Sequence, residues 1–154
     1  MAAHEIRSLS PLECPAAAAI IASNELWQSR YPYPAERATG DLQAALQAGD
    51  LVLGAFTPTL AGFAWVMPRG AFGRYPYLRL LAVSSDSHGG GAGAALLGAA
   101  EARFAGERQF FLMVSEFNER AQRFYQRQGY SYRGTVPDYA RDGIAEQLWS
   151  KRLS

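Results

Sequence analysis

Apolar residues recur along this chain at two different spacings, and these spacings predict which segments are helices and which are strands. Apolar positions three and four residues apart are typical of amphipathic helices, whereas short apolar runs between glycine, proline and asparagine are typical of strands. We expect helices over residues 16–23, 35–48, 91–104 and 118–128. We expect strands over residues 4–9, 51–56, 61–66, 77–83, 109–115, 130–135 and 146–153, with loops at 68–76 and 136–143.

Several of these boundaries carry residues with a strong local preference. Ser10-Pro11-Leu12-Glu13 matches a capping box with proline at the first helical position, which predicts the start of a helix. Gly49-Asp50 predicts the end of the helix over residues 35–48. Thr57-Pro58-Thr59 predicts the turn of a hairpin. The order of helices and strands predicts an α/β (α+β) chain, with a mixed central sheet and helices on both faces.

Length and composition restrict the class of protein. A chain of 154 residues fits a single domain over residues 1–154 with an ordinary core. Hydrophobic residues make up 49% and charged residues 19%, which is typical of a globular chain. The net charge of +1 gives no reason to expect nucleic acid or an anionic membrane as a partner.

The sequence also indicates where the protein resides. No apolar run approaches the ~18 residues of a membrane span, and the N-terminus shows no signal peptide. Cys14 is the only cysteine, so no disulfide can form within the chain, and we interpret it as a buried thiol rather than a nucleophile. We therefore expect a cytoplasmic protein.

The segment over residues 81–97 is the most informative part of the chain. Its apolar run ends at Val83, four glycines fall within residues 89–93, and a stretch rich in alanine and leucine follows. We interpret this order as strand, glycine-rich loop and helix. Glycine permits positive φ and close approach of a ligand to the main chain. The N–H groups at a helix start favour an anion, so this loop predicts a phosphate site.

Three phosphate-binding patterns compete for this loop. The P-loop pattern needs a Gly-Lys pair, which the chain lacks because Lys151 is its only lysine. The dinucleotide pattern G-x-G-x-x-G/A can be placed on Gly89, Gly91 and Ala94, with Glu116 as the ribose-binding acid. That fold usually opens with the motif, however, and here about half of the chain precedes it. The third pattern is [Q/R]-x-x-G-x-[G/A], which His88-Gly89-Gly90-Gly91-Ala92-Gly93 fits except at its first residue.

A second motif lies one helix and one strand further along the chain. Residues 118–130 fit the pattern N-x-x-A-x-x-x-Y-x-x-x-G-[FY]. Asn118 is a good helix N-cap and Gly129 a good C-terminal cap. From spacing alone, Tyr125 fits a core aromatic residue and a functional hydroxyl equally well.

The two motifs together resemble the acyl-CoA core of the Gcn5-related N-acetyltransferase (GNAT) superfamily over about residues 77–130. The resemblance implies a single-domain fold with a mixed, mostly antiparallel sheet. It implies an acyltransferase that uses acetyl-CoA as cosubstrate and moves the acetyl group by direct attack to a primary amine of a small molecule or peptide. No covalent intermediate and no metal is needed for this reaction.

The resemblance also implies roles for individual residues. Backbone groups at Leu81 and Val83 would pair with the pantetheine arm, and N–H groups from Gly89 to Ala94 would hold the pyrophosphate. Asn118 would add a hydrogen bond to the CoA arm, and the Tyr125 hydroxyl would protonate the leaving thiolate as the catalytic acid. The implied cofactor-binding residues are Leu81, Ala82, Val83, His88, Gly89, Gly90, Gly91, Ala92, Gly93, Ala94 and Asn118.

The sequence departs from the GNAT pattern in two places. His88 stands where the loop usually begins with arginine or glutamine, so we expect somewhat weaker CoA binding. Met113 stands five residues before Asn118, where relatives that acetylate protein N-termini often have a glutamate base. A base must then come from elsewhere, or water relays the proton. The candidate carboxylates are Glu25, Glu116 and Asp138, and each of them is more simply interpreted as a surface charge.

The acceptor is the part of the function that the sequence specifies least. Trp27, Tyr31 and Tyr33, together with Tyr139, are aromatic residues that could either wall an acceptor pocket or pack a connecting segment. Open edges of a mixed sheet would allow a homodimer. His4 and His88 are the only histidines and show no metal-ligand spacing. Two alternatives stay open, a non-catalytic acyl-CoA-binding sensor module and a small dinucleotide-binding protein.

Overall fold

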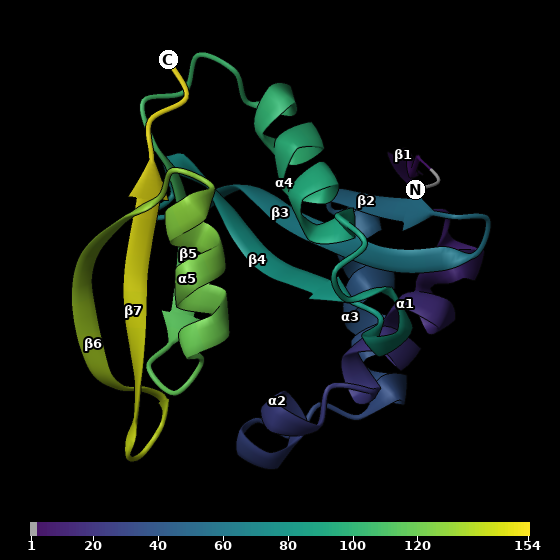
Figure 1. Ribbon diagram of the computed structural model, residues 1–154, viewed down its shortest axis with the longest axis horizontal. Helices are drawn as coiled ribbons and strands as arrows, with labels where there is room; N and C mark the ends of the chain where they lie inside the picture. Colours follow the sequence, from purple (N-terminus) through teal and green to yellow (C-terminus); the bar gives the residue numbers. More distant parts are fainter. Residues whose placement is uncertain (1–2) are drawn as a thin grey trace. The chain divides into compact units, whose positions relative to one another are not determined.

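The computed structural model describes residues 3–154. Its strands form one seven-stranded sheet in the order β1-β2-β3-β4-β5-β7-β6 (Figure 1). The pairs β1–β2, β2–β3, β5–β7 and β6–β7 are antiparallel, and the pair β4–β5 is parallel. The mixed, mostly antiparallel sheet that the resemblance implies is therefore confirmed.

The chain forms two compact units. The first consists of the chain up to Val66 together with Leu80–Arg103, and the second of Met67–Arg79 and Phe104–Ser154. Strands β3 (Leu60–Ala71) and β4 (Tyr75–Val83) contribute residues to both units. The prediction of a single domain over residues 1–154 stays a prediction.

The first unit is a three-stranded antiparallel ladder with helices on both sides. Figure 1 shows α4 in front of β2 and β3, with α1 and α3 behind them. Helices α3 and α4 both contact β2, and α1 packs against α3. Its fully buried side chains include Ile21, Leu42, Phe63 and Leu96. The other elements of this unit are β1 (Glu5–Ser8), η1 (Pro11–Glu13), α1 (Cys14–Ala22), α2 (Glu25–Arg30), α3 (Ala35–Gln47), β2 (Leu51–Phe56), η2 (Ser85–Ser87) and α4 (Ala92–Arg103).

The capping box predicted at Ser10 begins this helical region. The Glu13 carboxylate accepts a hydrogen bond from the Ser10 N–H at 2.9 Å, so one of the donors at the helix start is satisfied. Cys14 is fully buried, as predicted, and its thiol lies 3.8 Å from the Ser10 carbonyl oxygen. Burial raises the pKa of this thiol, and the nearby charge of Glu13 raises it further, which fits an unreactive group.

The second unit contains the parallel pair and the C-terminal antiparallel strands. Tyr77 pairs with Phe111 and Leu78 with Leu112, and β7 pairs with both β5 and β6. Phe110 and Leu112 are fully buried in it. Its further elements are β5 (Phe110–Ser115), α5 (Glu119–Arg127), β6 (Ser131–Arg141) and β7 (Ile144–Lys151).

The loop predicted over residues 68–76 is wrong, because β3 and β4 are joined by a tight turn. The Arg74 N–H donates to the Ala71 carbonyl at 3.0 Å, and the two central residues, Phe72 and Gly73, have φ of 58° and 67°. Two successive positive φ values are those of a type I′ turn, which suits the twist of a hairpin. The prolines at 68 and 76 suggested a loop, but proline fits a strand wherever its nitrogen need not donate.

The loop predicted over residues 136–143 is also wrong, because β6 continues to Arg141. This strand is almost wholly exposed, so it lacks the apolar alternation that marks a strand in the sequence. Its register against β7 shifts between Tyr132 and Gly134 and again between Val136 and Arg141.

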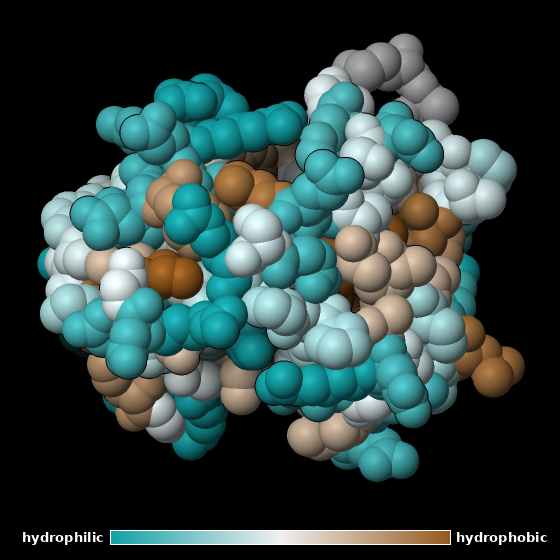
Figure 2. Space-filling model, turned by 90° about the horizontal axis from the view of Figure 1, so that it is seen from below, coloured by the Kyte–Doolittle hydropathy of each residue, from teal (hydrophilic) through white to brown (hydrophobic). Residues whose placement is uncertain are grey.

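Half of the exposed large hydrophobic side chains lie on β6, and the others come from separate segments. On the face seen in Figure 2, hydrophobic patches are interrupted by hydrophilic side chains. Among residues 3–154, no helix combines the length and the hydropathy needed to cross a membrane. The large hydrophobic residues that are exposed are Leu12, Leu26, Phe72, Tyr132, Val136 and Tyr139.

Candidate functional site

The glycine-rich loop leads from η2 into the first turn of α4, as the sequence predicts. Gly89 and Gly91 both have φ of 83°, a left-handed conformation that side chains with a Cβ adopt at a cost. The Ala95 N–H donates to the Gly91 carbonyl at 3.0 Å. By helix geometry, the N–H groups of the turn before Ala95 have no carbonyl within the helix, and they lie at its positive end. The loop therefore has the geometry of an anion site.

His88 is exposed, and its side chain turns back toward the end of β4. Its Nε2 lies 3.2 Å from the Val83 carbonyl oxygen. A carbonyl can only accept, so we assign the proton of this contact to Nε2. The imidazole therefore links the first residue of the loop to Val83, the last residue of β4.

The end of β4 carries the residues Leu81, Ala82 and Val83, which are half-buried. The ladder between β4 and β5 consists of the pairs at Tyr77 and Leu78, so these three residues lie beyond it on the same strand. On the β3 side, the Ser84 N–H donates to the Ala61 carbonyl at 2.8 Å.

Gly62 of β3 permits this close packing. A Cβ at position 62 would lie 2.8 Å from the Ala82 carbonyl oxygen and 3.2 Å from the Val83 Cα, which are backbone atoms. We therefore expect Gly62→Ala to lower the free energy of unfolding by about 1–3 kcal/mol through overpacking, and to weaken ligand binding at the end of β4. Urea denaturation measures the first effect and calorimetry the second.

Gly40→Ala is the matched control for this substitution. Position 40 lies within α3, with no atom within 4 Å of an added Cβ. Alanine in place of glycine in a helix raises stability by roughly 0.5–1 kcal/mol. Equal effects of the two substitutions would contradict the packing argument at Gly62.

Helix α5 carries the second motif and has both of the predicted caps. The Asn118 side-chain oxygen accepts from the Ala121 N–H at 3.1 Å. At the other end, Gly129 has φ of 94°, its N–H donates to the Gln126 carbonyl at 3.1 Å, and the Tyr130 N–H donates to the Tyr125 carbonyl at 3.0 Å. These two bonds make a Schellman motif.

Tyr125 lies in the last turn of α5 and is 9% exposed. Its ring packs edge-on against Phe124 and Tyr130, with centroids 5.1 and 5.8 Å apart. Burial raises the pKa of the Tyr125 hydroxyl above its usual range, and interaction with Tyr77 raises it further. The Tyr125 hydroxyl therefore carries its proton at neutral pH, as an ordinary tyrosine also does, and the raised pKa makes it a weaker acid.

Tyr77 is the residue near this site that the sequence did not single out. It lies on β4, and burial is the main cause that raises the pKa of its hydroxyl to about 12. Tyr77 is one of the two causes that raise the pKa of Tyr125, and both residues belong to the second unit. A tyrosine in an apolar strand gives no sequence signal of such a pairing.

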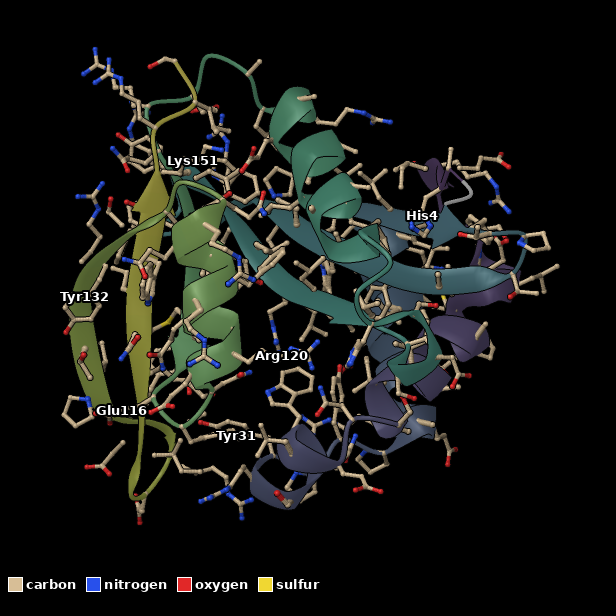
Figure 3. The ribbon with its side chains drawn as sticks, in the orientation of Figure 1. His4, Tyr31, Glu116, Arg120, Tyr132 and Lys151 are labelled. Carbon is tan, nitrogen blue, oxygen red and sulfur yellow. The ribbon has the colours of Figure 1, made fainter. Side chains whose placement is uncertain are left out.

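The three aromatic residues predicted to contact the acceptor differ in how exposed their side chains are. Tyr33 is buried, and its hydroxyl donates to the Asp41 carboxylate at 2.5 Å, so it anchors the segment to α3. Its backbone N–H donates to Gln28 at 2.8 Å. Trp27, on α2, and Tyr31, which ends α2, stay partly exposed (Figure 3 labels Tyr31).

The candidate bases lie at three different places. Glu25 opens α2, and Glu116 lies in the turn between β5 and α5 (Figure 3); both are exposed. Asp138 is already used within the β6–β7 hairpin, because its carboxylate accepts from the Gly143 N–H at 2.7 Å. Met113 lies on β5 opposite Leu148 and cannot accept a proton. In the part of the chain that the structure describes, no three His, Cys, Asp or Glu residues cluster as metal ligands do.

Comparison with known proteins agrees with this architecture. Residues 21–130, more than half of the chain, match the acetyltransferase (GNAT) family. No curated protein sequence matches significantly. Three of the similar solved structures cover nearly the full length of both chains. A protein from Desulfovibrio desulfuricans described as a GNAT-family acetyltransferase has 22% identity and a TM-score of 0.84, over 99% of this chain and 100% of its own.

Of the other two structures, one has a named activity and one contains a bound cofactor. Ribosomal-protein-alanine N-acetyltransferase from Brucella melitensis has 22% identity and a TM-score of 0.77, over 97% of this chain and 99% of its own. An acetyltransferase from Salmonella typhimurium, solved with its cofactor acetyl-CoA, has 18% identity and a TM-score of 0.77, over 99% of this chain and 95% of its own. At 18–22% identity, the similarity to these three structures establishes the fold alone.

The fold, the glycine-rich loop and the matched segment together define an acetyltransferase. The chain belongs to the GNAT family of acetyltransferases. This assignment favours the acyl-CoA interpretation of the loop over the dinucleotide one.

Proposed function

We propose that this protein transfers the acetyl group of acetyl-CoA directly to a primary amine of a small molecule or peptide, with Tyr125 as the general acid. The observation that carries the proposal is the loop before α4, where Gly89 and Gly91 hold positive φ at the start of a 12-residue helix. Family membership adds that such a loop belongs to an acetyltransferase.

The residues present fit a pyrophosphate of CoA. Nothing lies within 4 Å of the positions that Cβ atoms would take at Gly89 and Gly91, so a ligand can approach the main chain there. The Gly90 N–H already donates to the Ser87 carbonyl at 3.1 Å. The other backbone N–H groups from Gly89 to Ala94 are assigned to the pyrophosphate, and they need no side-chain charge from position 88. Bound acetyl-CoA would supply the acetyl group as a thioester.

The chain's own groups then account for positioning and proton transfer. Backbone groups of Leu81 and Val83, beyond the β4–β5 ladder, are assigned to the pantetheine arm and the acetyl carbonyl. The neutral amine attacks the carbonyl carbon, a C–N bond forms and the C–S bond breaks. The nitrogen releases one proton to solvent as the amide forms, and solvent returns a proton to Tyr125 after it has protonated the sulfur. The Tyr125 hydroxyl donates its proton to the leaving sulfur, whose thiol has an ordinary pKa near ~8.5.

The acceptor must lose a proton to become a nucleophile, because a lysine-like amine has a pKa near ~10.4. Trp27 and Tyr31 are the partly exposed aromatic residues assigned to the acceptor, and a cationic amine suits aromatic walls. Of the three carboxylates, Asp138 is engaged within its hairpin, which leaves Glu25 and Glu116. Met113 argues against the peptide N-terminus chemistry of the ribosomal-protein relatives, so small amines are the first choice.

Asn118 offers a test that separates capping from cofactor binding. Serine is as good an N-cap as asparagine but lacks the amide donor. We therefore expect Asn118→Ser to change the free energy of unfolding by less than about 0.5 kcal/mol, and to weaken acetyl-CoA binding about fivefold, the value of one hydrogen bond. Thermal unfolding and calorimetry measure the two quantities. Unchanged affinity would leave Asn118 with its capping role alone.

The proposal as a whole is tested by titrating acetyl-CoA into the purified protein calorimetrically, with a nicotinamide dinucleotide as control. We expect one-to-one binding of acetyl-CoA and no heat from the control. A panel of small amines and short peptides, assayed by release of the CoA thiol, then identifies the acceptor class.

Each of the other outcomes would lead to a different conclusion about the function. Tight acetyl-CoA binding without thiol release on any acceptor would indicate a non-catalytic acyl-CoA sensor. Preference for the dinucleotide would overturn the assignment of the loop. Absence of both heats would mean that His88 or another departure has disabled the site. The cytoplasmic location expected from the sequence stays a prediction.

A further inference from the structure

His4 connects the glycine-rich loop to two distant segments of the first unit. It directly precedes β1, and its half-buried ring lies beside the start of α4 (Figure 3). Its Nε2 lies 3.0 Å from the Gly90 carbonyl oxygen, and its Nδ1 lies 2.5 Å from the Thr57 hydroxyl in the β2–β3 turn. A single side chain thus bridges a strand start, a hairpin turn and the loop.

The chemistry of these partners assigns the protons. The Gly90 carbonyl can only accept, so Nε2 of His4 carries a hydrogen and donates it. In the neutral ring, Nδ1 then has a lone pair, which accepts the hydrogen of the Thr57 hydroxyl. Both ring nitrogens are satisfied in this tautomer, and Thr57 fixes the rotation of the ring.

The bond to Gly90 orients the peptide group that the ligand would contact. In a trans peptide the carbonyl and the following N–H point in opposite directions. With the Gly90 carbonyl directed at His4, the Gly91 N–H is directed away from His4. The neighbouring peptides are held as well, because the Gly90 N–H donates to Ser87 at 3.1 Å and the Ala95 N–H donates to Gly91 at 3.0 Å.

We infer that His4 is a positioning residue, which holds the Gly90–Gly91 peptide in the orientation that binds the pyrophosphate of acetyl-CoA. The inference rests on the proposed function. Glycine loses more conformational freedom on ordering than any other residue, so a run of three glycines is costly to order at the moment of binding. The His4 bond orders the loop in advance and lowers that cost.

The test compares His4→Leu with His4→Gln. Leucine removes both hydrogen bonds, whereas the glutamine amide can place a donor near the position of the imidazole Nε2. We expect His4→Leu to raise the Kd of acetyl-CoA about five- to tenfold, with kcat at saturating acetyl-CoA unchanged within about twofold. His4→Gln should restore most of the affinity. Glu5→Gln, at the neighbouring exposed position, is the control and should behave as the unaltered protein.

A substrate without phosphates shows whether the effect comes from the loop. S-acetylpantetheine has the thioester and the arm but no pyrophosphate, so its kcat/KM should be the same for His4→Leu as for the unaltered protein. In the free protein, the amides of Gly90 and Ala95 are hydrogen-bonded within the loop, so their hydrogen exchange should be faster in His4→Leu.

Three results would overturn the inference. Equal losses with acetyl-CoA and S-acetylpantetheine would indicate a general structural defect. No recovery in His4→Gln would show that the donor to Gly90 is not what matters, and unchanged affinity in His4→Leu would remove the role altogether. If the unaltered protein fails to bind acetyl-CoA, the proposed function falls and this ligand assignment with it. Faster amide hydrogen exchange in the loop of His4→Leu would then show that His4 stabilises the loop without a role in binding this ligand.

Discussion

The substitution Tyr125→Phe should slow acetyl transfer by about 10²-fold, the usual contribution of a general acid, while acetyl-CoA binds as it does to the unaltered protein. It removes one oxygen and keeps the ring that packs against Phe124 and Tyr130. The cap that follows Tyr125 is made by backbone groups, so it is retained. Turnover at saturating acetyl-CoA and a calorimetric Kd measure the two quantities separately.

The dependence on pH gives this tyrosine a second signature. Because burial raises the pKa of Tyr125 above the ordinary ~10 of tyrosine, its hydroxyl keeps its proton at pH values where an exposed tyrosine loses it. Turnover should therefore not fall through this group as the pH rises to 10. Above pH ~10 the folded chain holds more protons than the unfolded chain, so stability present below that pH is lost as the pH rises further. Tyr125→Phe should reduce this loss.

Two other tyrosines provide the controls. Tyr132 is exposed on β6, where its hydroxyl contacts Thr135, and Tyr132→Phe should leave turnover unchanged. Tyr77→Phe tests the neighbouring phenol, whose pKa burial raises to about 12. If Tyr77→Phe shows the large loss and Tyr125→Phe does not, the proton donor has been assigned to the wrong tyrosine. Weakened binding in Tyr125→Phe would indicate a binding role instead.

The substitution Gly91→Val should weaken acetyl-CoA binding by about 5- to 100-fold. Position 91 has φ of 83°, and a β-branched residue there costs about 1–3 kcal/mol. Nothing crowds the position, so the cost comes from the backbone and not from a clash. In the free variant, the loop relieves this strain by adopting another conformation, in which its N–H groups no longer face the ligand. Binding must then restore the original conformation, which costs affinity. Calorimetric titration measures the loss directly.

Gly98→Ala, within α4, is the matched control for this substitution. Position 98 has no positive φ and no atom within 4 Å of an added Cβ. We expect unchanged affinity and a gain in stability of roughly 0.5–1 kcal/mol. If Gly91→Val bound acetyl-CoA as tightly as Gly98→Ala, the positive φ at Gly91 would have no part in binding.

Local signals in the sequence predicted the elements that position the site. The caps at Asn118 and Gly129 and the glycines at 89 and 91 act over a few residues, so their geometry can be predicted from neighbours alone. The tight turn at Phe72 could not, because phenylalanine at positive φ contradicts its own preference. Its side chain is largely exposed, and its ring lies edge-on to Phe111 with the centroids 5.5 Å apart.

Contacts between distant residues account for what the sequence could not show about the site. His4 reaches Gly90 across 86 residues, and Tyr77 on β4 raises the pKa of Tyr125 on α5. Neither pair has a spacing that a pattern could detect. Tyr33 is a related case, since from the sequence it fits a pocket wall and a packing residue equally well, and only the structure shows that its hydroxyl donates to Asp41. Its place in the acceptor site stays a prediction. The identity of the acceptor depends on such contacts, which is why it stays the least specified part of the function.

The two outer strands of the sheet bear on how copies of this protein meet. At one edge, β1 is only four residues long and includes Glu5 and Arg7. At the other edge, β6 changes register twice and includes Pro137, which has no N–H to offer. Short, charged or irregular outer strands resist the addition of a further strand and the aggregation that follows from it. We therefore predict that a homodimer of this chain forms through its helices or loops rather than by joining two sheets into one.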